Sequence, residues 1–294
     1  MRFLSNIKFA LISVAALASS TVQATSCIAY LKYTDGFWQV WAMDAQGQNQ
    51  TLVSKSQYDK SRLSWYPDAS HLLLNSNDGE LFKLNLETAQ ETSIDVGMKG
   101  MFDAVVSPNG KQVTFGLSTS GSRDDHNVWV VNLANKKARK LTNLKFMQHL
   151  PAWSPNSQSI YFSSKTDDQH NDIMKAVLDG KNIKYITSDA LYNFDAIESV
   201  NKEIALSSNR TGAYNIWKIN KSGEARQLTN RPARDARPEW SADGKQIVFE
   251  SSHGGQVNIW KINADGSELK QLTRDSLGAR FPVWAPMQQS GVCD

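Results

Sequence analysis

The chain has 294 residues, of which 40% are hydrophobic and 21% charged, and its formal charge is +3. Two of the basic residues, Arg2 and Lys8, lie in the expected leader, and its removal lowers the charge from +3 to +1. A nearly neutral chain gives no electrostatic reason to expect a nucleic-acid ligand. No segment after the leader is apolar for long enough to cross a bilayer, so we expect no membrane span.

Residues 1–24 have the features of a secretory signal peptide. A positive region is followed by an apolar segment, residues 9–18, and by the small-residue cleavage site Val22-Gln23-Ala24. The apolar segment is too short to be a stable membrane anchor. We therefore expect an exported, periplasmic protein. A secreted form is one alternative, and lipid attachment at Cys27 is another, although residues 24–26 resemble a lipoprotein box only loosely.

After the leader, one pattern recurs six times. Its clearest copy has a turn at Trp240–Gly244, a strand at Ile247–Phe249, a strand at Asn258–Asn263 and the pair Leu272-Thr273. The residue before the turn recurs every 41 to 47 positions, at Trp65, Val106, Trp153, Glu198, Trp240 and Trp284. This period is typical of four-stranded propeller blades, which must pack on one another to bury their apolar faces. The pattern predicts an all-β, six-bladed propeller.

Each copy is expected to contain four short strands, because the apolar runs are short, β-branched or aromatic, and bounded by turn residues. The first strand ends at the residue before the turn. The second strands are predicted at 72–74, 113–115, 160–162, 204–206 and 247–249. The third strands are predicted at 40–41, 81–82, 128–129, 173–174, 216–217 and 259–260. The fourth strands are predicted to end at the pairs 141–142, 186–187, 228–229 and 272–273.

The two ends of the chain are predicted to share one blade. The last copy supplies only a first strand, at 281–284, and residues 28–30, 39–41 and 51–53 supply the other three. Such closure removes the exposed sheet edges that favour aggregation. Residues 25–294 then form a single propeller domain, and we expect a monomer.

Cys27 and Cys293, the only two cysteines, flank the break in the composite blade. Their predicted proximity suggests a disulfide that joins the two ends. In the simplest chain model, closing a loop of about 265 residues stabilises the fold by roughly 5 kcal/mol. The alternative is the lipid-modified Cys27.

Eight of the nine tryptophans lie at two repeated positions: four end the first strand and four lie in the third strand. Aromatic residues in such number could stack on sugars or bases. Their recurrence at equivalent positions instead favours a core between blades, where large flat side chains fill the gap between facing sheets.

The repeat resembles the WD40-like (PD40) repeat of TolB-type propellers. The matching segments include Trp153-Ser154-Pro155-Asn156, Trp240–Gly244, Asn215-Ile216-Trp217 and the Leu-Thr pairs, and the resemblance covers residues 27–293. Similar blades occur in the Tol–Pal envelope protein, in prolyl oligopeptidase-type hydrolases and in oligogalacturonate lyases. The chain leaves no room for the extra α/β domain that precedes the propeller of the Tol–Pal protein. It also lacks the G-x-S-x-G motif of the hydrolases.

The first strand of each blade should be innermost, so its early residues should line the central channel. Candidate binding residues at this channel mouth are Arg62, Asp103, His149, Asp195, Arg237 and Arg280. A ring of mixed charge could bind a small anion, a peptide terminus or a cation. Alternatively, these charges pair with one another or with channel water.

No catalytic residue, metal site or cofactor is predicted, although a divalent cation in the channel stays possible. The resemblance to lyases implies several histidines around one metal, but His126, His170 and His253 fall in loops of different blades. The leading hypothesis is therefore a periplasmic scaffold that binds an envelope protein or lipoprotein. One alternative is a carbohydrate-active enzyme using Asp103 and Asp195. Another is a small-ligand sensor using Arg62, Arg237 and Arg280.

Overall fold

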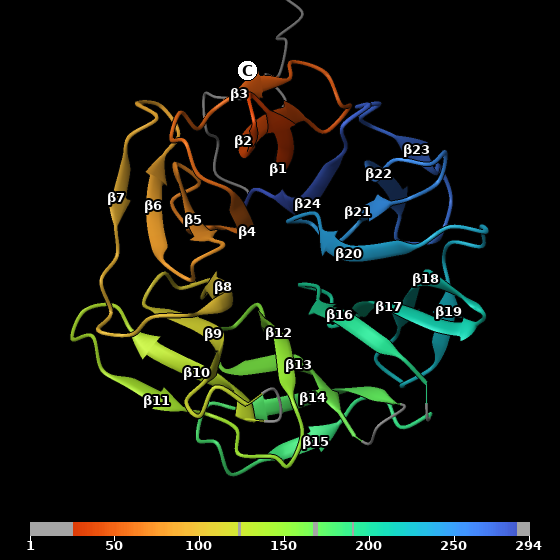
Figure 1. Cartoon of the computed structure of the whole chain (residues 1–294). Helices are drawn as coiled ribbons and strands as arrows, with labels where there is room; N and C mark the ends of the chain where they lie inside the picture. Colours follow the sequence, from red (N-terminus) through yellow and green to blue (C-terminus); the bar gives the residue numbers. More distant parts are fainter. Residues whose placement is uncertain (1–25, 123–124, 167–169, 190, 287–294) are drawn as a thin grey trace, which may run out of the picture.

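The computed structural model describes residues 26–122, 125–166, 170–189 and 191–286. These residues form six antiparallel sheets of four strands each, arranged in a ring around one axis (Figure 1). No helix in these ranges is long and apolar enough to cross a membrane. The predicted six-bladed propeller is confirmed.

Within each blade the strands run in chain order from the channel to the rim. The inner strands are β4 (Lys60–Trp65), β8 (Phe102–Val106), β12 (Gln148–Trp153), β16 (Asn193–Glu198), β20 (Asp235–Trp240) and β24 (Ala279–Trp284). The second strands are β5 (His71–Ser76), β9 (Gln112–Ser118), β13 (Ser159–Lys165), β17 (Ile204–Thr211), β21 (Gln246–Ser251) and β1 (Cys27–Thr34). The third strands are β6 (Leu81–Asn85), β10 (His126–Asn132), β14 (Asn171–Val177), β18 (Ala213–Ile219), β22 (Asn258–Asn263) and β2 (Phe37–Asp44). The outer strands are β7 (Glu91–Ser93), β11 (Ala138–Lys140), β15 (Ile183–Tyr185), β19 (Ala225–Gln227), β23 (Lys270–Gln271) and β3 (Thr51–Leu52).

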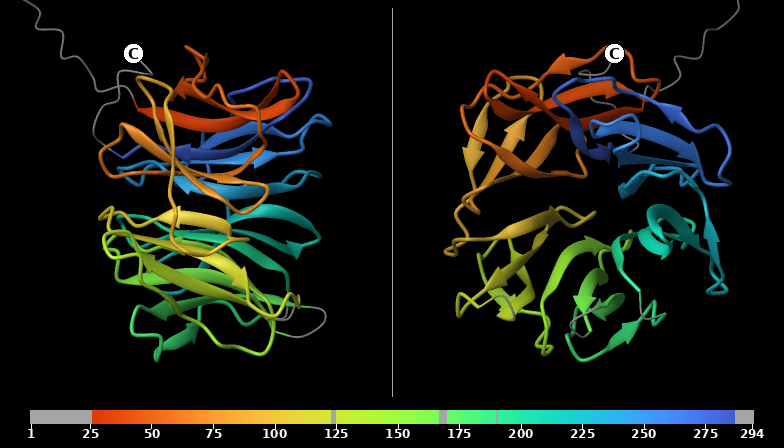
Figure 2. Two further views of the ribbon diagram at one scale, coloured as in Figure 1. Left: turned by 60° about the vertical axis from the view of Figure 1, so that its left-hand side comes forward. Right: turned by 45° about the vertical axis from the view of Figure 1, so that its right-hand side comes forward.

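The sixth blade combines both ends of the chain, as predicted. Strand β24 pairs with β1, which continues into β2 and β3, and the two further views show β1 and β24 side by side (Figure 2). The main-chain N–H of Ala285 also donates to the carbonyl of Cys27 at 2.8 Å. Cys27 is buried in β1, whereas Cys293 and the expected signal peptide lie outside the described residues.

The tryptophans that end the inner strands form a core between blades. Trp65, Trp153 and Trp240 are 6–9% exposed. Each indole N–H donates to a main-chain carbonyl of the preceding inner strand, at Val283 (3.1 Å), Val105 (3.0 Å) and Ile197 (3.1 Å) respectively. These contacts join neighbouring blades near the channel and agree with the core interpretation of this position.

The tryptophans of the third strands are half-buried, and a basic side chain covers each ring. The cation-to-ring distances are 4.4 Å for Lys32 on Trp41, 5.8 Å for Lys140 on Trp129, 4.6 Å for Arg210 on Trp217 and 4.2 Å for Arg231 on Trp260. These cation–π contacts occupy the ring faces. The rings are therefore not free platforms for sugars or bases.

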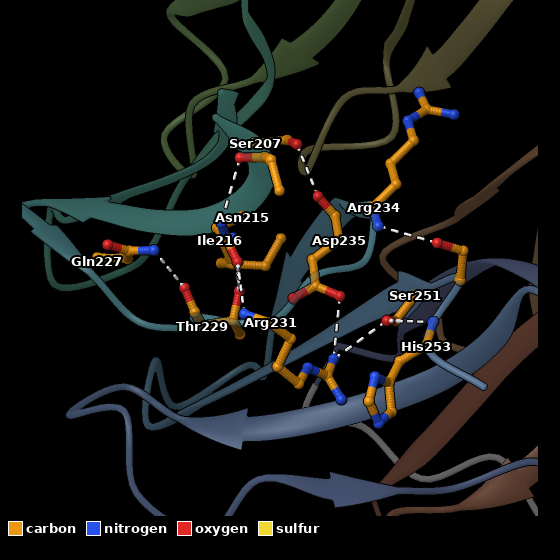
Figure 3. A network of polar contacts seen from close by, with 12 residues as sticks. Ser207, Asn215, Ile216, Gln227, Thr229, Arg231, Arg234, Asp235, Ser251 and His253 are labelled. Atoms are coloured by element: carbon orange, nitrogen blue, oxygen red, sulfur yellow. Dashed lines mark hydrogen bonds and ion pairs between the residues drawn. The ribbon is translucent and has the colours of Figure 1, made fainter. Parts of the chain in front are cut away.

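The predicted Leu-Thr pairs follow directly on the outer strands: the first residue still donates its main-chain N–H to the third strand, as from Leu228 to Ile216 at 2.8 Å, whereas the threonine pairs through its side chain. In the blade of β16–β19, the main-chain N–H of Ile216 donates to the Thr229 hydroxyl at 2.9 Å, and that hydroxyl donates to Asn215 Oδ1 at 3.3 Å (Figure 3). The threonine side chain thus replaces a backbone partner of the third strand. This substitution ends the outer strand and directs the chain towards the next inner strand.

The first blade contains a fully buried lysine at the start of β4. The ammonium of Lys60 donates to Gln39 Oε1 at 2.9 Å and to the carbonyls of Ser56 and Tyr58, both at 3.0 Å. Burial lowers the pKa of Lys60 to about 8, against the opposing effect of nearby acidic residues. Lys60 therefore connects the composite blade to the first complete one.

Candidate functional site

A repeated backbone bulge shapes the channel wall. Every inner strand shifts its register against the second strand. In five of the six inner strands, the residue three positions before the strand end has a left-handed φ of 53–56°: Asp103, Leu150, Asp195, Arg237 and Phe281. Such φ values are uncommon for residues other than glycine, and bulges often redirect side chains near binding sites. The bulge lets several residues of one strand approach the channel.

A small cavity of about 20 Å³ lies in the channel, and we call it the neck. It is lined by successive residues of the inner strands, among them Arg62, Asp195, Arg237 and Glu239. A cavity of this size holds about one water molecule. The neck therefore divides the channel into two mouths.

One mouth lies where the inner strands begin, and we call it the polar mouth. Arg237 Nε contacts Glu250 Oε1 at 3.1 Å, and its Nη1 lies 3.9 Å from Asp195 Oδ1. Glu250 Oε2 also accepts the main-chain N–H of Phe281 at 3.1 Å. Burial opposes the charge of Arg237, but the carboxylates of Asp195, Glu250 and Asp103 outweigh that effect and raise the Arg237 pKa. The polar mouth thus holds a fixed cation between carboxylates.

Aromatic rings contact two cations of this mouth, Arg237 and the further residue Arg280. The guanidinium of Arg280 lies 3.6 Å from the ring centre of Trp38, and that of Arg237 lies 4.0 Å from the ring centre of Phe281. Burial lowers the pKa of Arg280, against the opposing carboxylate of Glu250. These contacts hold both guanidinium groups in fixed orientations.

His149 contributes a neutral group to the polar mouth. Its ring packs edge-on against Phe194, with ring centres 5.6 Å apart. Burial lowers the His149 pKa, and Asp103 and Asp195 only partly oppose this effect. The imidazole is therefore uncharged at neutral pH and can donate or accept a hydrogen bond.

Five of the six predicted site residues meet at or beside the polar mouth, and Arg62 instead faces the neck and the opposite mouth. Five of the six also carry a buried polar atom with no hydrogen-bond partner among the described residues: Arg62 Nε, His149 Nε2, Asp195 Oδ1, Arg237 Nη1 and Arg280 Nε. Buried polar atoms are nearly always satisfied by protein, water or ligand. These atoms therefore mark where water or a ligand binds in the channel.

The sequence reasoning missed two acidic residues of the channel. Glu250 lies on β21 and forms the ion pair with Arg237. The signal in the sequence was its position, because Glu250 is a charged residue directly after the apolar run 247–249. Glu239 lies two residues after Arg237 on β20, and the alternation of a strand could have placed both on the channel side.

The second mouth lies at the turns that follow the inner strands, and it is a cavity of about 400 Å³. We call it the Pro–Trp funnel, after the residues that dominate its wall: Trp65, Trp153, Trp240, Trp284, Pro67, Pro108, Pro155 and Pro286. Glu239 and Arg62 line both the funnel and the neck. Burial raises the pKa of Glu239 to about 7, although Arg62 acts in the opposite direction.

No group of three or more His, Cys, Asp or Glu residues in the described ranges could hold a metal ion. His126 begins β10, and its ring centre lies 4.9 Å from that of Phe102 beside the polar mouth. His253 is exposed and packs against Trp260, and His170 belongs to a third blade. The three histidines are therefore distributed over separate blades, as the sequence predicted.

The comparisons with known proteins agree with this fold. A family model of the TolB β-propeller domain matches residues 21–288. The chain belongs to the TolB β-propeller family. No curated protein sequence matched the chain.

Two solved structures named as TolB share the fold with this family member. TolB from Acinetobacter baumannii has a TM-score of 0.78 and 20% identity, over 89% of this chain and 67% of that one. A putative TolB from Agrobacterium tumefaciens has a TM-score of 0.71 and 22% identity, over 85% of this chain and 89% of that one. An oligogalacturonate lyase in complex with manganese has a TM-score of 0.61 and 15% identity, over 85% and 74%. At these identities the likeness concerns the fold alone.

Proposed function

We propose that this TolB-family propeller is exported to the periplasm and binds another envelope protein or lipoprotein through its polar mouth. The observation that carries the proposal is the cluster of fixed charges with unsatisfied polar atoms, led by Arg237, Asp195 and Arg280. The closed ring holds these groups rigidly, so binding would cost little conformational entropy. Guanidinium groups near aromatic rings are also enriched at protein interfaces.

The polar mouth also presents an apolar contact beside its charges. Leu277, in the loop before β24, is 60% exposed and lies three residues before Arg280. Leu277 and Arg280 therefore belong to one short segment, the loop before β24 and the start of that strand. Such a combination of apolar and charged contacts suits a protein surface better than a sugar.

The carbohydrate-active alternative relies on Asp103 and Asp195 as a catalytic pair. Asp195 accepts the main-chain N–H of Arg237 at 3.3 Å and lies beside its guanidinium. These contacts engage the Asp195 carboxylate with the protein itself and favour a structural role over that of a general acid. We therefore place the protein-binding function first, and the small-ligand function of Arg62, Arg237 and Arg280 after it.

The test is site-specific photo-cross-linking in the native periplasm. A cross-linking residue replaces Leu277 at the polar mouth, Val200 at the rim of the opposite mouth, or Tyr185 on an outer strand. The last two are both 56% exposed. We expect one envelope protein to be captured from position 277 and not from positions 200 or 185.

A charge variant gives the control for specificity. Arg280→Gln keeps the first three side-chain carbons and removes the charged guanidinium, so capture from position 277 should fall at least about tenfold if the guanidinium binds the partner. The exposed substitution Glu87→Gln should leave capture unchanged. Equal capture from all three positions, or capture that Arg280→Gln does not reduce, would exclude the polar mouth as the binding surface.

A further inference from the structure

The Pro–Trp funnel is a second candidate site, at the end of the channel opposite the polar mouth. Its rim repeats one position of every blade, two residues after the inner strand, and all six are apolar: Pro67, Pro108, Pro155, Val200, Ala242 and Pro286. At about 400 Å³ it falls within the range of small-molecule sites. The wall therefore suits the apolar part of a small ligand.

The floor of the funnel has a different chemistry. Among the described residues that line the cavity, Arg62 and Glu239 are the only charged ones, and they have opposite charges. Within the described part of the chain, neither side chain has a hydrogen bond or an ion pair, although the charge of Arg62 acts to lower the Glu239 pKa. The two groups are thus too far apart to satisfy each other, and both face the same space.

A ligand of a single charge would satisfy only one of these groups. An anion could pair with the Arg62 fork but would lie near the Glu239 carboxylate. A cation could pair with the Glu239 carboxylate but would lie near the Arg62 guanidinium. A head group with adjacent positive and negative charges satisfies both, because its carboxylate can take the bidentate guanidinium contact and its ammonium can donate to Glu239.

The Glu239 carboxylate also makes the floor of the funnel asymmetric. In the other five blades the position of Glu239 holds Ser64, Val105, Ala152, Ile197 or Val283. The acidic contact therefore occurs once around the ring, and a bound head group has one preferred orientation. A charge retained among apolar neighbours without a partner also costs stability, which is expected at a binding site.

We propose that the Pro–Trp funnel binds a free α-amino acid with an apolar side chain, with its carboxylate on Arg62 and its ammonium on Glu239. The side chain lies against the apolar wall. This activity is independent of the protein-binding function, because it uses the opposite mouth of the channel.

Isothermal titration calorimetry of the mature protein with L-leucine and L-phenylalanine tests the proposal. Four ligand controls each remove one feature: N-acetyl-leucine removes the ammonium, leucine methyl ester removes the carboxylate, glycine removes the apolar group, and N,N,N-trimethyl-leucine removes the N–H donors of the ammonium. We expect each change to weaken binding at least about tenfold relative to the better amino acid. Because these controls use the wild-type protein, they do not depend on a variant that folds.

Two variants then assign the contacts. Glu239→Gln should weaken amino-acid binding at least about tenfold, and N-acetylation should cost nothing further in this variant. Arg62→Gln should also weaken amino-acid binding at least about tenfold, and methyl esterification of the ligand should cost nothing further in this variant. Arg280→Gln, at the polar mouth, should leave amino-acid binding unchanged, and Glu239→Gln should leave cross-linking at position 277 unchanged.

The proposal is overturned if neither amino acid binds the wild-type protein, or if N-acetyl-leucine binds as tightly as leucine. It is also overturned if Glu239→Gln, shown to be folded by circular dichroism, binds leucine with wild-type affinity. Failure of the partner cross-linking does not affect these results, so the two functions are judged separately.

Discussion

Replacing Glu239 with glutamine should stabilise the ligand-free propeller at neutral pH, and the gain should disappear in acid. Burial raises the Glu239 pKa from 4.5 to about 7. The folded protein therefore keeps a proton that the unfolded chain releases between these two pH values. The stability of the wild type must fall as the pH rises through that window, because the unfolded state binds fewer protons there.

The size of the effect follows from the shift. A pKa difference of about 2.5 corresponds to about 3.4 kcal/mol, at 1.36 kcal/mol per unit. This is an upper bound, since Glu239 borders a channel that admits water, so we expect a gain of about 1–3 kcal/mol at pH 8. Below pH 4.5 the carboxyl group is neutral in both states. Glutamine, a neutral side chain of similar shape, should then give no gain.

Urea unfolding of the wild type and Glu239→Gln at several pH values between 4 and 8 measures this difference. Glu87→Gln is the matched control, because Glu87 is exposed to solvent, so its difference from wild type should not vary with pH. A gain that is the same at pH 4 and pH 8, or a loss at pH 8, would refute the argument that Glu239 is an unpaired charge in an apolar setting.

Three further predictions concern the contacts that hold the ring together. Trp153→Phe removes the indole donor to the Val105 carbonyl and should lower the free energy of unfolding in urea by about 1–3 kcal/mol. The indole N–H of Trp284 has no hydrogen-bond partner in the described part of the chain, so Trp284→Phe should cost less in the same assay. Lys60→Met removes three hydrogen bonds, of which the Gln39 Oε1 and Ser56 carbonyl acceptors keep a second donor while the Tyr58 carbonyl keeps none among the described residues, and should cost about 1–3 kcal/mol at pH 7. The deficit should widen between pH 8 and 10.5, because the folded wild type releases its Lys60 proton before the unfolded chain does and gains stability there. Cys293→Ser should lower stability by up to about 5 kcal/mol if the predicted disulfide forms, and a reducing agent should then destabilise the wild type, but not the variant, by a similar amount.

Much of the fold was predictable because the repeat is periodic in the sequence. The spacing of Trp65, Trp153, Trp240 and Trp284 determines the blades, and the missing strands at the two ends require a shared one. The repeat predicts that each outer strand closes with a Leu-Thr pair. The structure uses the threonine hydroxyl as a partner of the third strand, as at Thr229, and a side-chain hydrogen bond of this kind has no periodic signal.

The candidate site was predictable only in outline. Placing the early residues of the inner strands at the channel followed from strand order, and the structure brings Asp195, Arg237 and Arg280 to one mouth. The sequence could not show that Glu250, from the neighbouring strand β21, forms an ion pair with Arg237. It also could not show that the chain bulges at this position, since Leu150 and Phe281 have no preference for a left-handed φ.

The sequence by itself therefore determined the number of blades, their closure and the residues that form the core, since these depend on patterns that repeat along the chain. Only the tertiary structure decided which charges meet, because Arg62 and Glu239 lie 177 positions apart in the sequence and line the same two cavities of the channel. An unpaired carboxylate in an apolar funnel results from the packing of six different strands, and no single repeat contains that information.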